Sequence, residues 1–193
     1  ITSALQSMLD DAKISLNYRP VLKELEQKHL IVVKELGLEE TDINTIIQAD
    51  MIKIQDILYA IYLTGSYSKE IQNLILGYGE LWSGMILKEY LNQQNKTAFL
   101  DASKVLFIYE KEGLIGIDWK RSKAALNDYR NSNDFNQLVI TGFIASTSDG
   151  KRTTLGRNGS DFSAAIFANL FKAESLVIWT DVDGIYTADP NLV

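Results

Sequence analysis

The stretch TTLGRNGSDFSAA, residues 153–165, decides how the rest of the chain is interpreted. Its first residues suit a short strand, and they lead into a glycine-rich loop, residues 156–159, that carries one cation, Arg157. An apolar helix is expected to follow from about residue 161 to residue 172. Backbone N–H groups and the positive end of a helix dipole converge at such a junction, so the stretch predicts a site for an anion.

The segments around this stretch alternate between strands and helices. Short apolar runs at residues 137–141 (QLVIT) and 176–180 (LVIWT) are typical of strands buried in a parallel sheet. A strand at Thr97–Leu100, then a loop and a helix from about Asp118 to Asn131, are expected before them. This alternation predicts an α/β fold with a mostly parallel sheet.

The ends of these strands carry the polar candidates for a site. Ligands bind beyond the carboxyl ends of parallel strands, and Gly142-Phe143, Arg157–Asp161 and Thr180–Asp183 all fall there. Hairpins are expected to turn at residues 148–150 and 183–184, each with an Asp-Gly pair. The convergence of three strand ends indicates one ligand site.

The first half of the chain is predicted to be helical. Apolar residues recur at helical spacing over residues 5–12, 20–37 and 40–65, and glycines at positions 37 and 65 are expected to stop the second and third helices. A fourth helix is expected after Ser68 as N-cap, and residues 77–80 (GYGE) interrupt its apolar stripe. The two glycines indicate either a kink with a solvated glutamate or a place where the backbone is closely approached.

The composition excludes several classes of function. The 193 residues are 46% hydrophobic with a formal net charge of −6, which suits one globular domain, or part of one, and disfavours nucleic-acid binding. There is no cysteine, and the single histidine, His29, cannot alone build a metal site or a Ser-His-Asp triad, so we expect a packing residue. No apolar run approaches the ~18 residues that span a bilayer, and we expect a cytoplasmic protein without a membrane partner.

The candidate residues permit binding and charge neutralisation rather than nucleophilic catalysis. Arg157 can bind a carboxylate or phosphate of a ligand through two parallel hydrogen bonds, and the glycines beside it favour this function over the alternative of a structural carboxylate as its partner. Ser160 and Asp161 could form only a helix N-cap, and Thr180 and Asp181 only a solvated turn. No nucleophile with a base, no metal cage and no P-loop pattern is evident, so the inventory suits phosphoryl transfer, which depends on positioning and electrostatics.

Three segments resemble the signatures of a known family. TTLGRNGSD, WTDVDGIYTADP and GYGELWS are similar to motifs of aspartokinases, members of the amino-acid kinase superfamily. Asn158, where monofunctional members more often have glycine, resembles the form fused to homoserine dehydrogenase. The likeness is specific around residues 142–190 and weaker over residues 2–36. It implies a three-layer αβα sandwich with a helical insert at residues 1–66 and a core at residues 67–193.

The resemblance also implies an activity, the ATP-dependent phosphorylation of the β-carboxylate of L-aspartate to 4-phospho-L-aspartate. This reaction is the first step toward lysine, threonine and methionine. Carried onto this chain, Arg157 would clamp an aspartate carboxylate, Glu80 would accept the ammonium group, and Phe143 would wall the pocket. Asn158 and Gly159 would offer loop N–H groups beside Ser160, which would hold carboxylate or phosphoryl oxygens.

The remaining implied roles concern catalysis and the nucleotide. Asp161 would orient a catalytic lysine, and with Arg157 it forms the implied catalytic pair. The nucleotide pocket would be lined by Thr180, Asp181 and Tyr186, with Asp183 nearby. Mg²⁺ would arrive with ATP rather than in a protein cage, and no metal-binding residue is expected. The full-length enzyme is expected to be a homo-oligomer that binds L-aspartate and ATP.

The sequence departs from the family at two places. The K-F-G-G loop, whose lysine neutralises the transferring phosphate, is absent, and the hairpin residue Lys151 does not replace it. Asn191 stands where the family often has an arginine after A-D-P. Since both ends look cut, we expect this polypeptide alone to lack useful aspartokinase activity.

Two other functions stay open at this point. The chain could be another superfamily enzyme, acting on a glutamate derivative or a nucleotide monophosphate, although Glu80 would repel a phosphate. It could instead be a non-catalytic sensing or assembly module with the same fold. The upstream and downstream sequence would discriminate between these functions.

Overall fold

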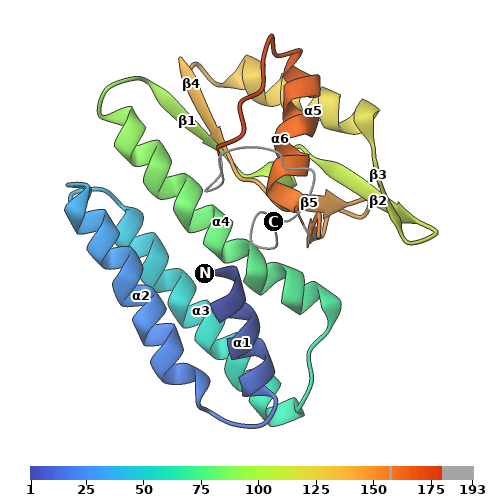
Figure 1. Cartoon of the computed structure of the whole chain (residues 1–193). Helices are drawn as coiled ribbons and strands as arrows, with labels where there is room; N and C mark the ends of the chain where they lie inside the picture. The colour runs from blue at the N-terminus through green and yellow to red at the C-terminus, as the bar shows by residue number, and fades with distance from the viewer. Residues whose placement is uncertain (157, 180–193) are drawn as a thin grey trace, which may run out of the picture.

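The computed structural model describes residues 1–156 and 158–179. These residues form a helical half and a mixed α/β half, with one long helix running between them (Figure 1). The helices are α1 (Thr2–Ala12), α2 (Tyr18–Glu35), α3 (Ile43–Thr64), α4 (Lys69–Asn92), η1 (Ala102–Lys104), α5 (Trp119–Ser132) and α6 (Gly159–Phe171). The strands are β1 (Thr97–Leu100), β2 (Phe107–Lys111), β3 (Leu114–Ile117), β4 (Gln137–Ile140), β5 (Ile144–Thr147) and β6 (Arg152–Thr154).

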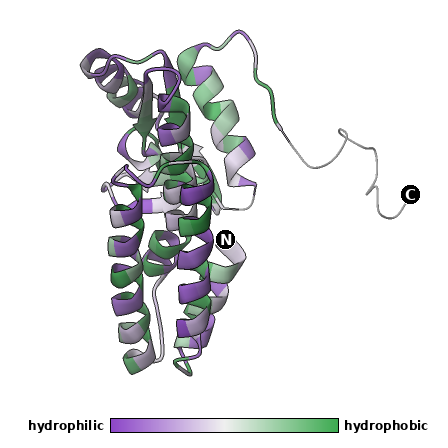
Figure 2. Ribbon diagram, turned by 90° about the vertical axis from the view of Figure 1, so that its left-hand side faces the viewer, coloured by the Kyte–Doolittle hydropathy of each residue, from purple (hydrophilic) through white to green (hydrophobic). Residues whose placement is uncertain are grey.

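The helices of the first half form where the apolar spacing predicts them. Their apolar stripes meet in one core, whose fully buried side chains include Leu5, Leu9, Ile54 and Trp82. The coloured ribbon shows the same division, since each helix has a hydrophobic and a hydrophilic side (Figure 2). Among the described residues, no helix combines the length and apolarity needed to cross a bilayer.

The predicted start and stop signals of these helices are confirmed. Gly37 and Gly65 take left-handed φ values of 67° and 68° directly after α2 and α3, a conformation that costs glycine little. Ser68 caps α4, because its Oγ accepts a hydrogen bond from the Ile71 N–H at 3.4 Å. The sequence therefore fixes where each of these helices begins or ends.

Helix α4 is continuous through residues 77–80. The close approach of another segment to its backbone is observed there. A Cβ atom on Gly79 would lie 2.7 Å from Cγ2 of Ile1, and one on Gly77 would lie 3.5 Å from Cδ1 of Ile144. The two glycines thus let α1 and β5 pack directly against the helix backbone.

The strands form two small sheets in the described part of the chain. β1 pairs with β4 in parallel, and the second sheet has the order β3-β2-β5-β6. In the second sheet β2 and β5 are parallel, while β2–β3 and β5–β6 are antiparallel hairpins. The α/β class is confirmed, and the observed strand pairing is mixed rather than mostly parallel.

Helices cover both faces of these strands, which gives the expected three layers (Figure 1). Successive strand residues point to opposite faces. Ile144 packs into the core shared with α4, whereas its neighbour Ala145 packs into a second core with Leu126 of α5 and Ile166 of α6. The division of the chain at residues 66 and 67 stays a prediction, since α4 contacts both halves.

Two expectations about strands are wrong. The segment after Thr97–Leu100, expected as a loop, contains the β2–β3 hairpin. Its turn residues Glu112 and Gly113 have φ values of 54° and 77°, as a two-residue turn between twisted strands requires. A non-glycine residue in the left-handed region is uncommon, so the Glu-Gly pair was a weak signal.

The second error concerns the apolar run at residues 176–180. Leu176–Trp179, expected as a buried strand, has no regular structure, and Val177 and Trp179 are 70% and 92% exposed. A strand forms only where a neighbour takes up its backbone hydrogen bonds, and no described strand pairs with this run. The hairpin expected at residues 183–184 lies outside the described residues.

Candidate functional site

A cavity of about 260 Å³ lies where α1, α4 and the β6–α6 loop meet. Its lining residues are Thr2, Glu80, Phe143, Gly156, Asn158, Gly159, Ser160 and Asp161. The structure therefore brings together every described residue that the sequence assigned to the substrate or to catalysis. Five assigned residues lie outside the described part of the chain: Arg157, Thr180, Asp181, Asp183 and Tyr186.

The start of α6 forms one wall of the cavity. Asn158 has a left-handed φ of 57° and makes no side-chain capping bond, and the Gly159 N–H donates to the Gly156 carbonyl at 3.1 Å. The first-turn N–H groups of an α-helix have no partner within the helix, and the dipole makes this end positive. Ser160 and Asp161 are exposed at this end, so the wall can accept an anion.

The backbone of Phe143 is held beside this loop by two hydrogen bonds, and a third continues from one of its partners. Its N–H donates to the Ser163 Oγ at 3.2 Å, and that hydroxyl donates to the Ser160 carbonyl at 2.8 Å. Its own carbonyl accepts from the Leu155 N–H at 2.8 Å. Phe143 has a φ of 62°, an unusual value for a bulky residue that this bonding stabilises. The ring is thereby fixed beside Gly159.

Glu80 brings a carboxylate to the same cavity from α4. The side chain is half-buried, and burial raises the pKa of its carboxyl group above the usual range. Within the described ranges no lysine or arginine lies at ion-pair distance from Glu80. A partly desolvated carboxylate without such a neighbour is suited to accept a cationic group of a ligand.

The cavity also contains residues that were not assigned from the sequence. Thr2 lines it from the first turn of α1, far from the other members in sequence. Nothing in its spacing distinguishes it from an ordinary polar helix residue. Gly156 belongs to the predicted loop, with a φ of 74°, but had no role of its own.

Two residues outside the cavity behave as expected. His29 is 5% exposed, and its Nδ1 lies 2.7 Å from the Leu25 carbonyl oxygen. Its ring packs against Trp82 in a T-shaped arrangement, with 4.9 Å between the ring centroids. This confirms a buried packing residue, and burial lowers the pKa of the imidazole. Lys151 lies in the β5–β6 turn, where its Nζ is 3.2 Å from Asp149.

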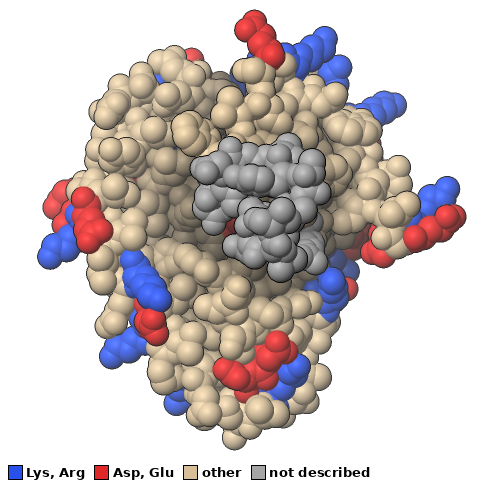
Figure 3. Space-filling view, viewed as in Figure 1, with Lys and Arg blue, Asp and Glu red and all other residues tan. Residues whose placement is uncertain are grey.

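On the face drawn in Figure 3, Lys and Arg side chains alternate with Asp and Glu side chains, mainly toward the outline of the molecule. No group of three His, Cys, Asp or Glu side chains in the described ranges could hold a metal ion. The cavity therefore has two acidic side chains, Glu80 on α4 and Asp161 in the first turn of α6, together with the N–H groups at the start of α6. Glu80 and these N–H groups come from different elements, an arrangement that suits a small ligand with both charges.

Fold and cavity together define an αβα protein with a small, partly charged cavity at a helix N-terminus. The chain belongs to the Amino acid kinase family, whose sequence model matches residues 17–193.

Several relatives carry more specific names. The chain is 36% identical over 182 residues to the bifunctional aspartokinase/homoserine dehydrogenase 1, chloroplastic, of Zea mays, covering 92% of this chain and 20% of the relative. It is 38% identical over 130 residues to the lysine-sensitive aspartokinase 3 of Escherichia coli, covering 65% of this chain and 28% of the relative. The chain thus spans a small part of the length of these curated relatives.

Solved structures with a similar fold also carry the name of aspartate kinase. The E. coli aspartokinase III in complex with aspartate and ADP (R-state) superposes with a TM-score of 0.85 at 28% identity, covering 100% of this chain and 42% of that one. The aspartate kinase of Clostridium acetobutylicum gives a TM-score of 0.73 at 29% identity, covering 100% of this chain and 39% of that one. The fold of the described residues is that of the corresponding part of these enzymes.

Proposed function

We propose that the protein containing this chain phosphorylates the β-carboxylate of L-aspartate with ATP, giving ADP and 4-phospho-L-aspartate. The observation that carries the proposal is the pairing of Glu80 with the start of α6 in one small cavity. An amino acid presents an ammonium group and carboxylates, which match these two walls. The names of the aspartokinase relatives support the same substrate.

Substrate recognition follows from the two charges of the cavity. Glu80 accepts the ammonium group of aspartate, and the buried position of its carboxylate strengthens this attraction. Arg157 and the N–H groups at the start of α6 that have no partner within the helix receive a carboxylate, with Asn158, Gly159 and Ser160 forming this part of the wall. Phe143 walls the cavity and limits the size of the ligand. A nucleotide monophosphate suits this cavity poorly, since Glu80 would repel its phosphate.

The reaction needs no nucleophile from the protein. An oxygen of the substrate β-carboxylate attacks the γ-phosphorus of ATP, the bond from that phosphorus to the bridging oxygen breaks, and ADP leaves with the electron pair. The α6 N-terminus and Arg157 stabilise negative charge on the transferring group. Asp161 orients the lysine that serves this role in aspartokinases.

The nucleotide part of the site remains a proposal from the sequence. Thr180, Asp181, Asp183 and Tyr186 are proposed to line the ATP pocket. Mg²⁺ is proposed to enter bound to the phosphates of ATP, because the described carboxylates form no cluster that could hold it. A homo-oligomeric, cytoplasmic enzyme also stays a prediction, and the plant relatives named above are chloroplastic.

A hydroxamate assay tests the proposed function. The protein at its natural length is incubated with L-aspartate, MgATP and hydroxylamine, and aspartyl hydroxamate is measured against L-glutamate as a control substrate. We expect turnover with aspartate, a strong loss in Glu80→Ala, and a raised KM for aspartate in Arg157→Ala. Wild-type protein that turns over glutamate, or neither amino acid, would overturn the proposal. The expected inactivity of the 193-residue chain alone stays a separate prediction.

A further inference from the structure

Glu80 and the α6 loop belong to different layers, so their separation depends on how α4 docks on β6. Apolar packing alone fixes such a separation poorly, because apolar contacts are not directional. Gly77 of α4 lies against β5 and β6 through contacts of this kind. A Cβ atom added to Gly77 would lie 3.5 Å from Cδ1 of Ile144 and 3.6 Å from Cδ of Arg152. A hydrogen bond between α4 and β6 would be directional and could therefore fix their separation.

Asn73 supplies such a tie. Its side chain is buried at 7% exposure, and its Nδ2 donates to the Thr153 Oγ1 at 2.9 Å. The Thr154 Oγ1 donates to the Asn73 Oδ1 at 3.2 Å. One amide of α4 thus bonds two consecutive hydroxyls of β6, and a shift of the helix along the strand would break both bonds.

The sequence positions connect this tie to both walls of the cavity. Asn73 precedes Glu80 by seven residues, about two turns, so both lie on one side of α4. On the other side of the tie, Thr154 precedes Gly156, the first cavity residue of the α6 loop, by two residues. The bonds of Asn73 therefore set the distance between the carboxylate of Glu80 and the helix start that faces it.

β6 needs this support because it is an edge strand of three residues. Its inner neighbour is β5, and Arg152 forms an ion pair with Asp101 at the end of β1. That pair connects β6 to the other sheet, not to α4. In the described part of the chain, the hydrogen bonds that join the side chains of α4 to β6 are those of Asn73.

We propose that Asn73 is a positioning residue for aspartate, which holds α4 against β6 so that Glu80 and the α6 N-terminus bind the two ends of one substrate. This inference rests on the proposed function. Asn73 does not line the cavity, so it acts through the two walls and not by touching the ligand.

The inference predicts which replacements retain the tie. Asn73→Leu keeps the number and branching of the side-chain heavy atoms and removes both bonds. Asn73→Asp keeps two acceptors for the threonine hydroxyls, each of which can donate, so it retains part of the tie. Thr153→Val with Thr154→Val removes the same bonds from the strand side without a change on α4.

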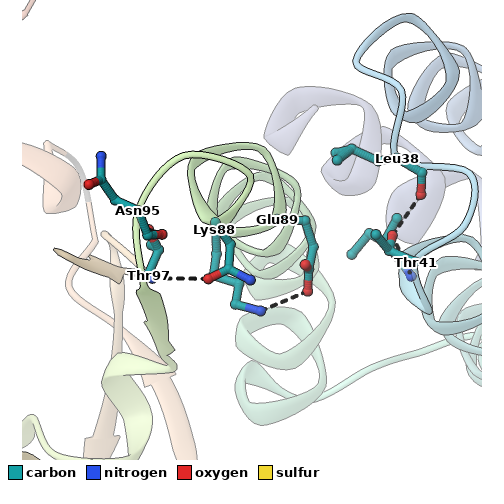
Figure 4. A network of polar contacts seen from close by, with 8 residues as sticks. Leu38, Thr41, Lys88, Glu89, Asn95 and Thr97 are labelled. Carbon is teal, nitrogen blue, oxygen red and sulfur yellow. Dashed lines mark hydrogen bonds and ion pairs between the residues drawn. The ribbon is translucent and has the colours of Figure 1, made fainter. Parts of the chain in front are cut away.

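Asn92, which is exposed, offers a control on the same helix. Its Oδ1 accepts a hydrogen bond from the Thr97 N–H at 3.0 Å. Thr97 lies at the passage from α4 to β1 (Figure 4). Asn92→Leu therefore also removes an asparagine tie between α4 and a strand, at the last residue of the helix and about three turns beyond Glu80.

The test compares steady-state kinetics of these variants in the protein at its natural length, together with thermal unfolding. We expect Asn73→Leu and the double valine variant to raise the KM for aspartate roughly 10- to 100-fold, the loss typical of a binding group misplaced by about 1 Å. In the same variants the KM for ATP should stay within about threefold of the wild-type value. In Asn73→Asp the increase in the KM for aspartate should be at most half as large as in Asn73→Leu on a logarithmic scale. Asn92→Leu should match wild type in the KM for aspartate and in the KM for ATP.

Combining Asn73→Leu with the double valine variant should add little further loss, because all three residues act through the same bonds. An unchanged aspartate KM in Asn73→Leu, or equal increases for aspartate and ATP, would overturn the role of Asn73. If Asn73→Leu does not fold, the double valine variant decides by the same criteria. Wild-type protein that does not turn over aspartate would overturn the proposed function itself. Wild-type protein that is active, with variants whose KM for aspartate is unchanged, would overturn only the role of Asn73.

Discussion

Gly142 lies so close to Ser160 that a Cβ atom added to it would come within 3.3 Å of the Cα, Cβ and Oγ atoms of Ser160. The segment between β4 and β5 thus rests directly on the first turn of α6. Two of these atoms belong to backbone or Cβ positions, which cannot move aside as the end of a flexible side chain can. The position of the anion-accepting helix start therefore depends on a missing side chain.

Gly142→Ala is expected to displace the start of α6 by a few tenths of an ångström and to lower kcat/KM for aspartate about tenfold or more. Gly150→Ala is the control, because Gly150 has a φ of 84° in the β5–β6 turn with no atom within 4 Å of its Cβ position. It should lower stability by strain at positive φ but leave the kinetic constants unchanged. Equal kinetics in both variants would contradict the prediction.

Glu80→Gln should separate stability from binding. Burial raises the pKa of Glu80, so the native state binds this proton more readily than the unfolded chain does. The ionised group consequently destabilises the fold at neutral pH, and this penalty is relieved as the pH falls through the raised pKa. Glu80→Gln should therefore be more stable than wild type in urea at pH 7.5, with a smaller difference at pH 5.

The same carboxylate should govern the pH dependence of binding. An ammonium group prefers ionised Glu80, so the KM for aspartate should rise in wild type as the pH falls through the raised pKa. In Glu80→Gln the KM should be high at every pH and its acid-side dependence should be absent. A wild-type KM that is constant from pH 8 to pH 5 would show that Glu80 does not bind the substrate.

Asp161→Asn is expected to act on the chemical step. The side chain is exposed in the first turn of α6, so the isosteric amide should fold normally and change stability by less than about 1 kcal/mol. Loss of the charge that orients the catalytic lysine should lower kcat roughly 100-fold with a smaller change in the aspartate KM. A raised KM at normal kcat would instead make Asp161 a substrate-binding residue.

His29→Phe should alter the acid stability of the helical half without affecting catalysis. Burial lowers the pKa of His29 in the folded state, so unfolding takes up a proton once the pH falls below the unfolded value of about 6.5. Stability from the neutral histidine is present above that pH and is lost below it. The variant should therefore lose less stability than wild type between pH 7.5 and pH 5.5 in urea titrations.

Much of the fold could be read from local patterns. The apolar stripes and the stop residues Gly37 and Gly65 gave correct helices in the first half, and Ser68 marked the start of α4. The strands Thr97–Leu100 and 137–140 were found because short apolar runs between turn signals have few other solutions. The β2–β3 hairpin was missed because its Glu-Gly turn requires a strained φ that the letters do not display.

The sequence predicted those parts of the candidate site that lie within one segment of the chain. Residues 158–161 and Phe143 fall at strand ends, and that pattern is visible in sequence. Glu80 was assigned through the family resemblance, since spacing alone allowed a solvated residue. Thr2 and the tie made by Asn73 had no signal, because each depends on contact with an element distant in the chain.

The sequence by itself determined the periodicities, the turn and cap residues and the glycine-rich anion loop, since these depend on the conformational preferences of neighbouring residues. Only the tertiary structure decided that Glu80 faces that loop, that Gly142 rests on Ser160, and that Leu176–Trp179 pairs with no described strand. These outcomes depend on the packing of α4 against β6 and of one layer on another. Such packing is set by the summed contacts of many distant residues, which no single stretch contains.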